Sequence, residues 1–430
     1  MSRLEKYPKY KDSGVEWLGE IPSEWELTRL GTRFIERKEK VSDKDYEPLS
    51  VTKNGIVPQL DSAAKSNDGD NRKLVKKGDF VINSRSDRKG SSGVSPLDGS
   101  VSLINIALKP LNINPDFCNY LLKSNGFVEE YYRNGHGIVA DLWTTRFWDM
   151  KSIMLGIPPL QEQQKIASFL DTKTQQLDKA IKQKEQLIKL LKERKQIVIN
   201  EAVTKGIDKT VTMKDSGVEW LGEIPKHWEV KKLKFIVSKV GSGVTPSGGA
   251  LGYLSKGIAL LRSQNILFEK IDYDNAVFIS KKTHKKMKNS QVQYGDILLN
   301  ITGGSIGRCN FVNVHKELNV NQHVCIIRPK NNIETVLLNS ILKSEVGQSQ
   351  IWSFQQGGGR EGLNFEAINN FDIPLPPPQE QKQIVEYIEN QTSKIDNAIN
   401  LQQKQIEKLK EYKTSLIDSI VTGKVRVCDE

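Results

Sequence analysis

The string DSGVEWLGEIP occurs twice in this chain, at Asp12–Pro22 and again at Asp215–Pro225, 203 residues apart. Over Lys11–Leu30 and Lys214–Leu233 the two copies share 15 of 20 residues without a gap. A second repeat follows, because residues 161–207 align with residues 379–425 at an offset of 218, with 16 identities in 47. The stretches between these repeats, roughly residues 31–156 and 234–372, are only faintly alike, and we call them the two middles. The chain is therefore two tandem halves, which suggests one scaffold that presents two different recognition surfaces.

Net charge and cysteine content narrow the class of protein. The formal charge of +11 and a pI near 9.2 favour a polyanionic partner. The four cysteines show no CxxC spacing, so neither structural zinc nor a disulfide framework is predicted. No apolar run approaches the ~20 residues that cross a bilayer, and no leader follows Met1. We expect a cytoplasmic protein without a membrane association.

The two middles read as mixed α/β domains with the same underlying fold. Short strand-like runs alternate with turns rich in Gly and Asp. The run from Lys77 to Asn83 resembles the run from Tyr294 to Asn300, and a proline follows the next strand in each half. The two tryptophans of each repeated motif are expected to be anchors that pin each middle to its adjoining helix, rather than stacking platforms for bases. The glycine-rich stretch that begins at Gly241 reads as a loop.

Each middle ends in prolines that lead into a long amphipathic helix. Both helices carry a heptad seam in matching register. The first seam is Thr174, Leu177, Ile181, Lys184, Ile188, Leu191, Lys195, Val198 and Ala202. The second is Thr392, Ile395, Ile399, Gln402, Ile406, Leu409, Lys413, Leu416 and Ile420. Nearly identical seams favour pairing between the two helices, while packing of each helix on its own domain is the alternative.

The predicted architecture is an α+β fold with pseudo-two-fold organisation. Two mixed α/β domains are joined by two helices that form an antiparallel coiled coil of roughly 65 Å. The polar seam residues would set its register. The predicted boundaries are 1–156 for the first repeated motif and domain, 157–207 for the first helix, 208–372 for the second motif and domain, and 373–430 for the second helix and tail.

Motifs for catalysis are missing from the sequence. There is no P-loop, no Asn-Pro-Pro-aromatic signature of adenine methyltransferases, and no clear nuclease core or nucleophile motif. These absences favour a binding protein that has no catalytic residues and no metal site of its own.

The pattern resembles the specificity subunit of Type I restriction-modification systems. The resemblance covers nearly the whole chain and rests on the duplicated DSGVEWLGEIP motif with its following tryptophan, the PPLQEQ and PPPQEQ motifs at Pro158–Gln163 and Pro376–Gln381, and the alternation of variable domain and helix.

The resemblance implies two target-recognition domains that each read one half of a bipartite, asymmetric double-stranded DNA site. The helix pair would act as a ruler for the spacer. Two adenine-N6 methyltransferase (modification) subunits carrying S-adenosylmethionine would dock on this chain, and restriction subunits with an ATP- and Mg²⁺-dependent motor would join them. The chain would bind no cofactor itself and would not be an enzyme alone.

Loop residues next to predicted strands are the candidates for DNA contact, because Arg, Lys, Asn and Gln side chains read base edges and phosphates. The first domain carries net charge of only about +3 and the second about +6, so basic loops on one face are expected rather than a basic domain. The candidates are Ser84, Arg85, Ser86, Arg88, Lys89, Trp143, Thr145 and Arg146 in the first domain, and Thr245, Arg262, Gln264, Asn265, Arg308, Asn321, Gln322 and Arg360 in the second.

Two other classes of protein stay open at this point. A protein-protein scaffold would use the rod and the tryptophan motifs, with the variable domains binding proteins. A nuclease would cleave DNA by itself in a metal-dependent reaction.

Overall fold

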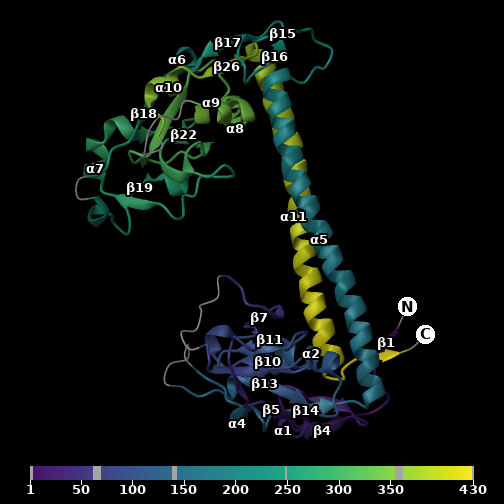
Figure 1. The fold of residues 1–430 in the computed structure, drawn as a ribbon. Coiled ribbons are helices and arrows are strands. Elements are labelled where there is room, and N and C mark those ends of the chain that lie inside the picture. Colours follow the sequence, from purple (N-terminus) through teal and green to yellow (C-terminus); the bar gives the residue numbers. More distant parts are fainter. Residues whose placement is uncertain (1–2, 62–68, 138–142, 247–248, 354–361, 429–430) are drawn as a thin grey trace. The chain divides into compact units, whose positions relative to one another are not determined.

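A computed structural model gives the fold, and it describes residues 3–61, 69–137, 143–246, 249–353 and 362–428 (Figure 1). The chain divides into two compact units. Unit 1 comprises Met1–Glu185 and Gln403–Glu430, and unit 2 comprises Gln186–Gln402. Each unit therefore contains one variable domain together with one part of each long helix.

Unit 1 is built around a four-stranded sheet in the order β11-β10-β13-β5, with α2 and α3 in its core. Its remaining strands form small sheets and hairpins, including a pairing of β1 with β27 from the far end of the chain. The strands are β1 (Arg3–Glu5), β2 (Tyr10–Asp12), β3 (Glu20–Pro22), β4 (Glu26–Arg29), β5 (Phe34–Glu36), β6 (Lys40–Val41), β7 (Leu49–Thr52), β8 (Gly55–Pro58), β9 (Arg72–Val75), β10 (Phe80–Asn83), β11 (Ser92–Val94), β12 (Gly99–Val101), β13 (Asn105–Pro110), β14 (Met154–Ile157) and β27 (Arg426–Cys428). The helices are α1 (Leu30–Arg33), η1 (Ser86–Arg88), α2 (Pro115–Lys123), α3 (Asn125–Arg133) and α4 (Phe147–Met150).

Unit 2 repeats this plan with the four-stranded order β23-β22-β25-β18, and adds a second four-stranded sheet, β20-β19-β24-β21. Its strands are β15 (Met213–Asp215), β16 (Glu223–Pro225), β17 (Glu229–Lys232), β18 (Val237–Ser242), β19 (Ile258–Leu261), β20 (Val277–Ile279), β21 (Gln291–Val292), β22 (Ile297–Asn300), β23 (Cys309–Phe311), β24 (Leu318–Val320), β25 (Val324–Pro329) and β26 (Asp372–Leu375). Its helices are α6 (Leu233–Ile236), η3 (Gly249–Gly252), η4 (Ser263–Asn265), α7 (Lys281–Lys286), η5 (Lys288–Ser290), η6 (Gly303–Ser305), α8 (Thr335–Lys343), α9 (Glu345–Ser353) and α10 (Phe365–Asn369).

The two variable domains share one fold, and they differ in one segment. In each domain an aspartate directly before a central strand, Asp79 before β10 and Asp296 before β22, forms an ion pair with an arginine. Arg37 donates two hydrogen bonds to Asp79, and Arg328 donates two to Asp296. These aspartates are 217 residues apart, whereas the repeated motifs are 203 apart. The extra residues therefore lie between β18 and β21, where unit 2 has β19, β20 and α7 and unit 1 has β6, β7 and β8.

The repeated motifs are structural, as predicted. Trp25 and Trp228 are almost completely buried, and each packs beside the glycine that follows a long helix. Those glycines, Gly423 and Gly206, have positive φ values of 77° and 71°, a backbone conformation that glycine adopts without strain at the end of a helix. The indole nitrogen of Trp228 also donates to Glu380 in α11 at 3.0 Å. The tryptophans thus fasten each domain to the helix ends.

The PPLQEQ and PPPQEQ motifs fasten the start of each helix. Gln163 is buried, donates through Nε2 to the carbonyl of Pro158 at 2.9 Å, and accepts through Oε1 from the backbone of Asn114 at 2.8 Å. Gln381 makes the same two bonds, to Pro376 and from the backbone of Glu334, both at 3.0 Å. One glutamine therefore ties each long helix to the helix pair of its own domain.

The long helices are α5 (Leu160–Lys205) and α11 (Pro378–Val421), and they pack against one another within each unit. All eighteen predicted seam positions are buried or half-buried, while most positions beside them are exposed. In unit 1, Lys413 binds Asp178 at 2.7 Å and Lys184 binds Gln405 at 2.5 Å. The later residue of α5 therefore pairs with the earlier residue of α11. The two segments are antiparallel there.

Within the described ranges, no helix is both long enough and apolar enough to cross a membrane.

Candidate nucleic-acid interface

Three segments meet at the same place in each variable domain. They are the loop after β10 or β22, the turn before β13 or β25, and the segment before the short helix α4 or α10. Ser84 donates its backbone N–H to the carbonyl of Ile104 at 3.2 Å, and Ile301 donates to His323 at 3.1 Å. Thr145 and Leu363 then donate to Ser84 and Ile301, both at 2.9 Å. We call these sets the first cluster (residues 84–91, 102–105, 143–148) and the second cluster (301–308, 321–324, 362–366).

The backbone bonds make the two clusters equivalent residue by residue. Isolated bridges join Arg85 to Thr144 and Thr302 to Gly362. The strands pair Asn83 with Asn105 in one domain and Asn300 with Val324 in the other. Arg85 therefore corresponds to Thr302, Ile104 to His323 and Leu103 to Gln322. The same backbone frame carries different side chains in the two domains.

The first cluster combines cations with exposed apolar groups around a cavity of about 550 Å³. The exposed side chains of Arg85 and Arg146 line it, beside Leu103 and Ile104, which are 40% and 42% exposed. Trp148 is 72% exposed, and the ammonium of Lys151 lies 3.1 Å from the centre of its ring. Exposed aromatic and aliphatic groups beside arginines form a surface suited to a ligand that is both anionic and partly apolar.

A charged pair lies at one wall of this cavity. Lys73 donates to the carbonyl of Asn105 at 2.8 Å and lies 3.4 Å from Glu36, and both charged side chains are largely buried. Glu36 can accept a hydrogen bond from a base amino group, and Lys73 can donate to a base or phosphate oxygen. The cavity thus offers donors, an acceptor and apolar contact together.

The centre of the second cluster is a set of hydrogen-bonded polar side chains. Thr302 Oγ1 and His323 Nδ1 are 2.7 Å apart, and His323 Nε2 is 2.9 Å from Gln322 Nε2. Asn321 accepts from the backbone of His323 at 3.2 Å, which fixes the turn that carries both side chains.

The structure divides the predicted contact residues into an accessible and a buried group. Exposed or half-buried in the first cluster are Arg85, Ser86, Arg88, Lys89, Trp143 and Arg146. Exposed or half-buried in unit 2 are Thr245, Arg262, Gln264, Arg308 and Gln322. Arg360 lies outside the described residues.

Four predicted contact residues need correction, because their side chains are buried: Ser84, Thr145, Asn265 and Asn321. Thr145 and Tyr131 exchange hydrogen bonds with each other's carbonyls, at 3.2 and 3.0 Å. Asn265 accepts from the backbone of Arg262 at 2.9 Å. We assign these side chains a structural role in holding the loops. The glycine-rich stretch also needs correction, since Gly241 and Ser242 belong to β18 and Gly243 packs directly on the carbonyl of Val320.

Sequence reasoning missed the side chains that complete each cluster. Glu36, Lys73, Leu103, Ile104 and Trp148 were not singled out in the first domain, nor were Thr302 and His323 in the second. Leu103 and Ile104 were hidden from sequence reasoning, because they lie in a run, Val101–Leu108, that reads as one strand. Glu36 and Lys73 join the cluster only through pairing of distant strands, which the sequence does not show.

Other groups give no sign of a catalytic site in the described parts of the chain. Burial raises the pKa of the Cys309 and Cys325 thiols to about 12, so both stay protonated at neutral pH. No group of three or more His, Cys, Asp or Glu residues is arranged there to hold a metal ion.

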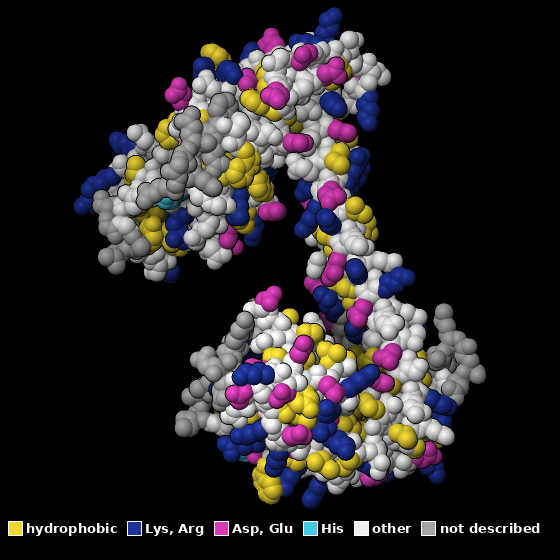
Figure 2. Space-filling model, in the orientation of Figure 1, with side chains coloured by type: hydrophobic (Ala, Val, Ile, Leu, Met, Phe, Trp, Pro, Cys, Tyr) yellow, Lys and Arg dark blue, Asp and Glu magenta, His cyan; other side chains and the backbone are white. Residues whose placement is uncertain are grey.

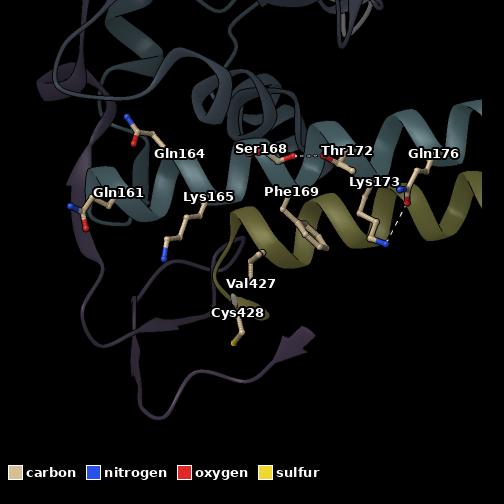
Figure 3. A pocket seen from close by; sticks show the side chains of 10 residues that line it. All are labelled: Gln161, Gln164, Lys165, Ser168, Phe169, Thr172, Lys173, Gln176, Val427 and Cys428. Carbon is tan, nitrogen blue, oxygen red and sulfur yellow. Dashed lines mark hydrogen bonds between the residues drawn. The ribbon is translucent and has the colours of Figure 1, made fainter. Parts of the chain in front are cut away.

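Unit 1 also carries mixed surface charge and a second hollow. Figure 2 shows Lys and Arg interspersed with Asp and Glu over the unit that carries β10, on the face drawn. A groove of about 620 Å³ lies between the start of α5 and β27, and Phe169 and Val427 are its apolar lining residues (Figure 3). Lys165, Lys173 and several glutamines line it, and it shares no residue with the two clusters.

Comparisons with known proteins point in one direction. Residues 22–190 and 225–411 match the family described as the Type I restriction modification DNA specificity domain. The Type I restriction enzyme MjaVIII specificity subunit of Methanocaldococcus jannaschii is 27% identical over 285 residues, covering 64% of this chain and 63% of that protein. The Type I restriction enzyme EcoBI specificity subunit of Escherichia coli is 31% identical over 248 residues, covering 56% and 52%. Both alignments span less than two thirds of the relative's length.

A solved structure shares the fold. A chain from a structure concerned with complex assembly and conformational transition of the type I R-M system superposes with a TM-score of 0.72. The match covers 94% of this chain and 99% of that chain at 16% identity, which establishes likeness of fold.

Proposed function

Because this chain belongs to the Type I restriction-modification DNA specificity family, we propose that it reads a two-part, asymmetric site in double-stranded DNA and brings methyltransferase and restriction subunits to that site. The observation that carries the proposal is the pair of equivalent clusters. One backbone frame occurs twice and presents Arg85, Leu103 and Ile104 in one domain but Thr302, Gln322 and His323 in the other. Identical clusters would read identical half-sites, whereas these two would read different ones.

Base readout and phosphate binding would fall to different residues. Arg85 lines the cavity of the first cluster, where a guanidinium can bind the O6 and N7 atoms of guanine together. Arg88 and Lys89 lie on the exposed side of η1 and are paired with Asp87 at 3.6 Å and Glu129 at 2.6 Å. Exposed pairs of this kind exchange readily for phosphate oxygens, so these two residues would supply affinity without sequence information.

The long helices would set the spacing between the two half-sites. We propose that α5 and α11 form one antiparallel coiled coil with pseudo-two-fold symmetry. Helices of 46 and 44 residues at about 1.5 Å per residue are each roughly 65–70 Å long. Equivalent ion pairs, Lys195 with Asp396 and Lys413 with Asp178, support a symmetric register.

Partner subunits would supply the chemistry. Large aliphatic side chains are exposed on the helices of unit 2, including Leu190 at 60%, Leu401 at 55% and Ile197 at 46%. Large aliphatic side chains on a helix surface are suited to a partner's helix. We propose that the exposed helix surfaces dock two adenine-N6 methyltransferase subunits, which would carry S-adenosylmethionine. Restriction subunits using ATP and Mg²⁺ would complete the assembly, and this chain would remain non-catalytic.

Methylation sequencing tests the proposal directly. The chain is expressed with the methyltransferase subunit of its own system, and modified adenines are mapped by single-molecule sequencing of the host DNA. We expect one motif with two different half-sites and a fixed spacer. A protein scaffold would give no motif that depends on this chain, and a nuclease would show metal-dependent cleavage by the purified chain alone.

A further inference from the structure

Two large aliphatic side chains stand at the corner of a tight turn in the first cluster. The turn runs from Ser102 to Asn105, and the N–H of Asn105 donates to the carbonyl of Ser102 at 3.0 Å. Its two central residues are Leu103 and Ile104, and both side chains are exposed. Turn corners usually carry Gly, Pro, Asn, Asp or Ser, because these residues suit the turn backbone or bond to it. Neither the turn nor burial in the core accounts for two aliphatic side chains at this place.

Hydrogen bonds fix the backbone of this turn. The carboxamide nitrogen of Asn105 donates to the carbonyl and to the hydroxyl oxygen of Ser102, at 3.2 and 3.1 Å. The carbonyl of Asn105 accepts from Lys73 at 2.8 Å, and the carbonyl of Ile104 accepts from the backbone of Ser84 at 3.2 Å. The bonds leave both aliphatic side chains accessible, so the turn can present them to a ligand without a rearrangement.

The equivalent turn of the second domain carries polar residues at the same two corner positions. The N–H of Val324 donates to the carbonyl of Asn321 at 3.2 Å, the same bond that closes the first turn. The central residues of this second turn are Gln322 and His323. A change from apolar to polar chemistry on an unchanged backbone is what two domains with different half-sites require at a position that contacts bases.

The charges around the aliphatic corner point to DNA as its ligand. The exposed side chains of Arg85 and Arg146 line the same cavity as Leu103 and Ile104. Guanidinium groups bind phosphate oxygens and the acceptor atoms of guanine, so this cavity is suited to a polyanion. The apolar group that such a polyanion presents in its major groove is the C5 methyl of thymine, which aliphatic side chains contact.

We propose that Leu103 and Ile104 read a thymine in the half-site bound by the first domain, by packing against its C5 methyl group. They act as specificity-determining residues beside Arg85. The inference rests on the function proposed above and names a base that the first half-site contains. Gln322 and His323 offer no aliphatic surface at the equivalent corner, so this reading of a methyl group belongs to the first domain.

The experiment uses the whole complex of this chain with its methyltransferase subunits and duplexes that carry the motif found by sequencing. Each thymine of the first half-site, on either strand, is replaced in turn by uracil, which lacks the C5 methyl and keeps every hydrogen-bonding group. For the wild-type chain we expect one position at which the replacement weakens binding about fourfold, the effect of removing one methyl group from an apolar contact. 5-Bromouracil at that position should restore the affinity, because bromine fills the space of the methyl group.

The readout is the ratio of the affinities for the thymine and uracil duplexes, since a defect in folding or in phosphate binding weakens both alike. In the double variant Leu103→Ala, Ile104→Ala this ratio falls to about one, while thymines of the second half-site keep their wild-type ratios. Leu97→Ala is the matched control, because Leu97 and Leu103 are both 40% exposed. Its neighbour Asp98 accepts from the backbone of Lys77 before β10, whereas the first cluster follows β10, so Leu97→Ala should keep the fourfold ratio.

The possible results separate the inference from the proposed function. A first half-site without an A·T pair, or insensitivity of all its thymines to loss of the methyl group, overturns the inference alone. Persistence of the fourfold ratio in the double variant does the same. Loss of the methyltransferase subunits from the double variant, with every thymine insensitive in the wild type, would assign the corner to a protein partner instead. Absence of any two-part motif for the wild-type chain overturns the proposed function and this inference together.

Discussion

The ammonium of Lys195 lies 2.7 Å from both carboxylate oxygens of Asp396. Lys413 binds Asp178 with the same distances, and the two pairs are related by the 218-residue offset of the repeat. Each pair joins α5 to α11 at a seam position, one in unit 2 and one in unit 1. The polar seam residues predicted from the heptads thus bond across the helices.

Exchanging the charges of one pair tests whether it stabilises the helices. Lys195→Glu alone places two carboxylates together and is expected to lower the free energy of unfolding. The double variant Lys195→Glu, Asp396→Lys restores the attraction and most of the stability. Because both groups are partly exposed, we expect a coupling of only about 0.2–1 kcal/mol in a urea-unfolding double-mutant cycle. Strictly additive effects would show that the pair contributes nothing.

Asp418 gives a prediction that depends on pH. Its Oδ1 accepts from the backbone of Asn125 at the start of α3, at 2.9 Å, and burial raises the pKa of this carboxyl. A raised pKa in the folded state means that stability falls as pH rises from the unfolded value of about 3.9 through the folded value. Asp418→Asn keeps the acceptor and removes the charge, so we expect it to raise the melting temperature at pH 7 by about 2 °C or less.

The other half of the chain provides the matched control. Asn200 accepts from the backbone of Glu345 at 3.0 Å, as Asp418 does from Asn125. Asn200→Asp places a new carboxylate beside Glu345 and should lower the melting temperature at pH 7. If Asp418→Asn and Asn200→Asp changed the melting temperature in the same direction and by the same amount, the role assigned to burial of Asp418 would be contradicted.

Trp228→Ala should be strongly destabilising. The side chain is completely buried, and its loss leaves a large cavity and removes a hydrogen bond to Glu380. We expect the free energy of unfolding to fall by about 3–5 kcal/mol, measured by urea unfolding monitored with far-ultraviolet circular dichroism. Trp148→Ala removes an exposed tryptophan and should change stability by less than about 0.5 kcal/mol.

Arg85 and Arg88 should differ in kind. Arg85→Ala is expected to cost about 1–3 kcal/mol on the correct site and to relax specificity at one position of the first half-site. Arg88→Ala should weaken binding to all sequences alike and reduce the dependence of affinity on salt. Methylation sequencing and salt titration of DNA affinity measure the two effects. Relaxed specificity in the second half-site would contradict the placement of Arg85.

Lengthening the helices should lengthen the spacer. Insertion of one heptad into α5 after Glu185 and one into α11 after Gln402 keeps both ion pairs and adds about 10 Å. At ~3.4 Å per base pair, the spacer should grow by about three base pairs while both half-site sequences stay the same. A heptad in α5 alone prevents both ion pairs from forming in register and should reduce methylation of every site. A changed half-site sequence in either variant would contradict the ruler role.

The repeated elements could be predicted from sequence because their evidence is local. The tryptophan motif, the QEQ helix starts and the heptad seam each lie in a continuous stretch, and burial of Trp25, Gln163 and Ile181 agrees with those readings. Arg85 was also within reach, since a basic loop after a strand is visible in the sequence. Thr145 and Asn321 were misjudged because nothing local indicates that a polar loop residue turns inward, Thr145 to bond the carbonyl of Tyr131 and Asn321 to bond the backbone of its own turn.

The sequence by itself determined that the chain is two halves with a shared scaffold, because repetition and periodicity survive without knowledge of contacts. Only the tertiary structure decided what each half presents. Strand pairing brings Glu36 and Lys73 beside Arg85, and it brings Thr302 beside His323, from segments about 12 to 50 residues apart. A hydrogen bond between such segments depends on register and on side-chain direction, and both are set by packing of the whole domain.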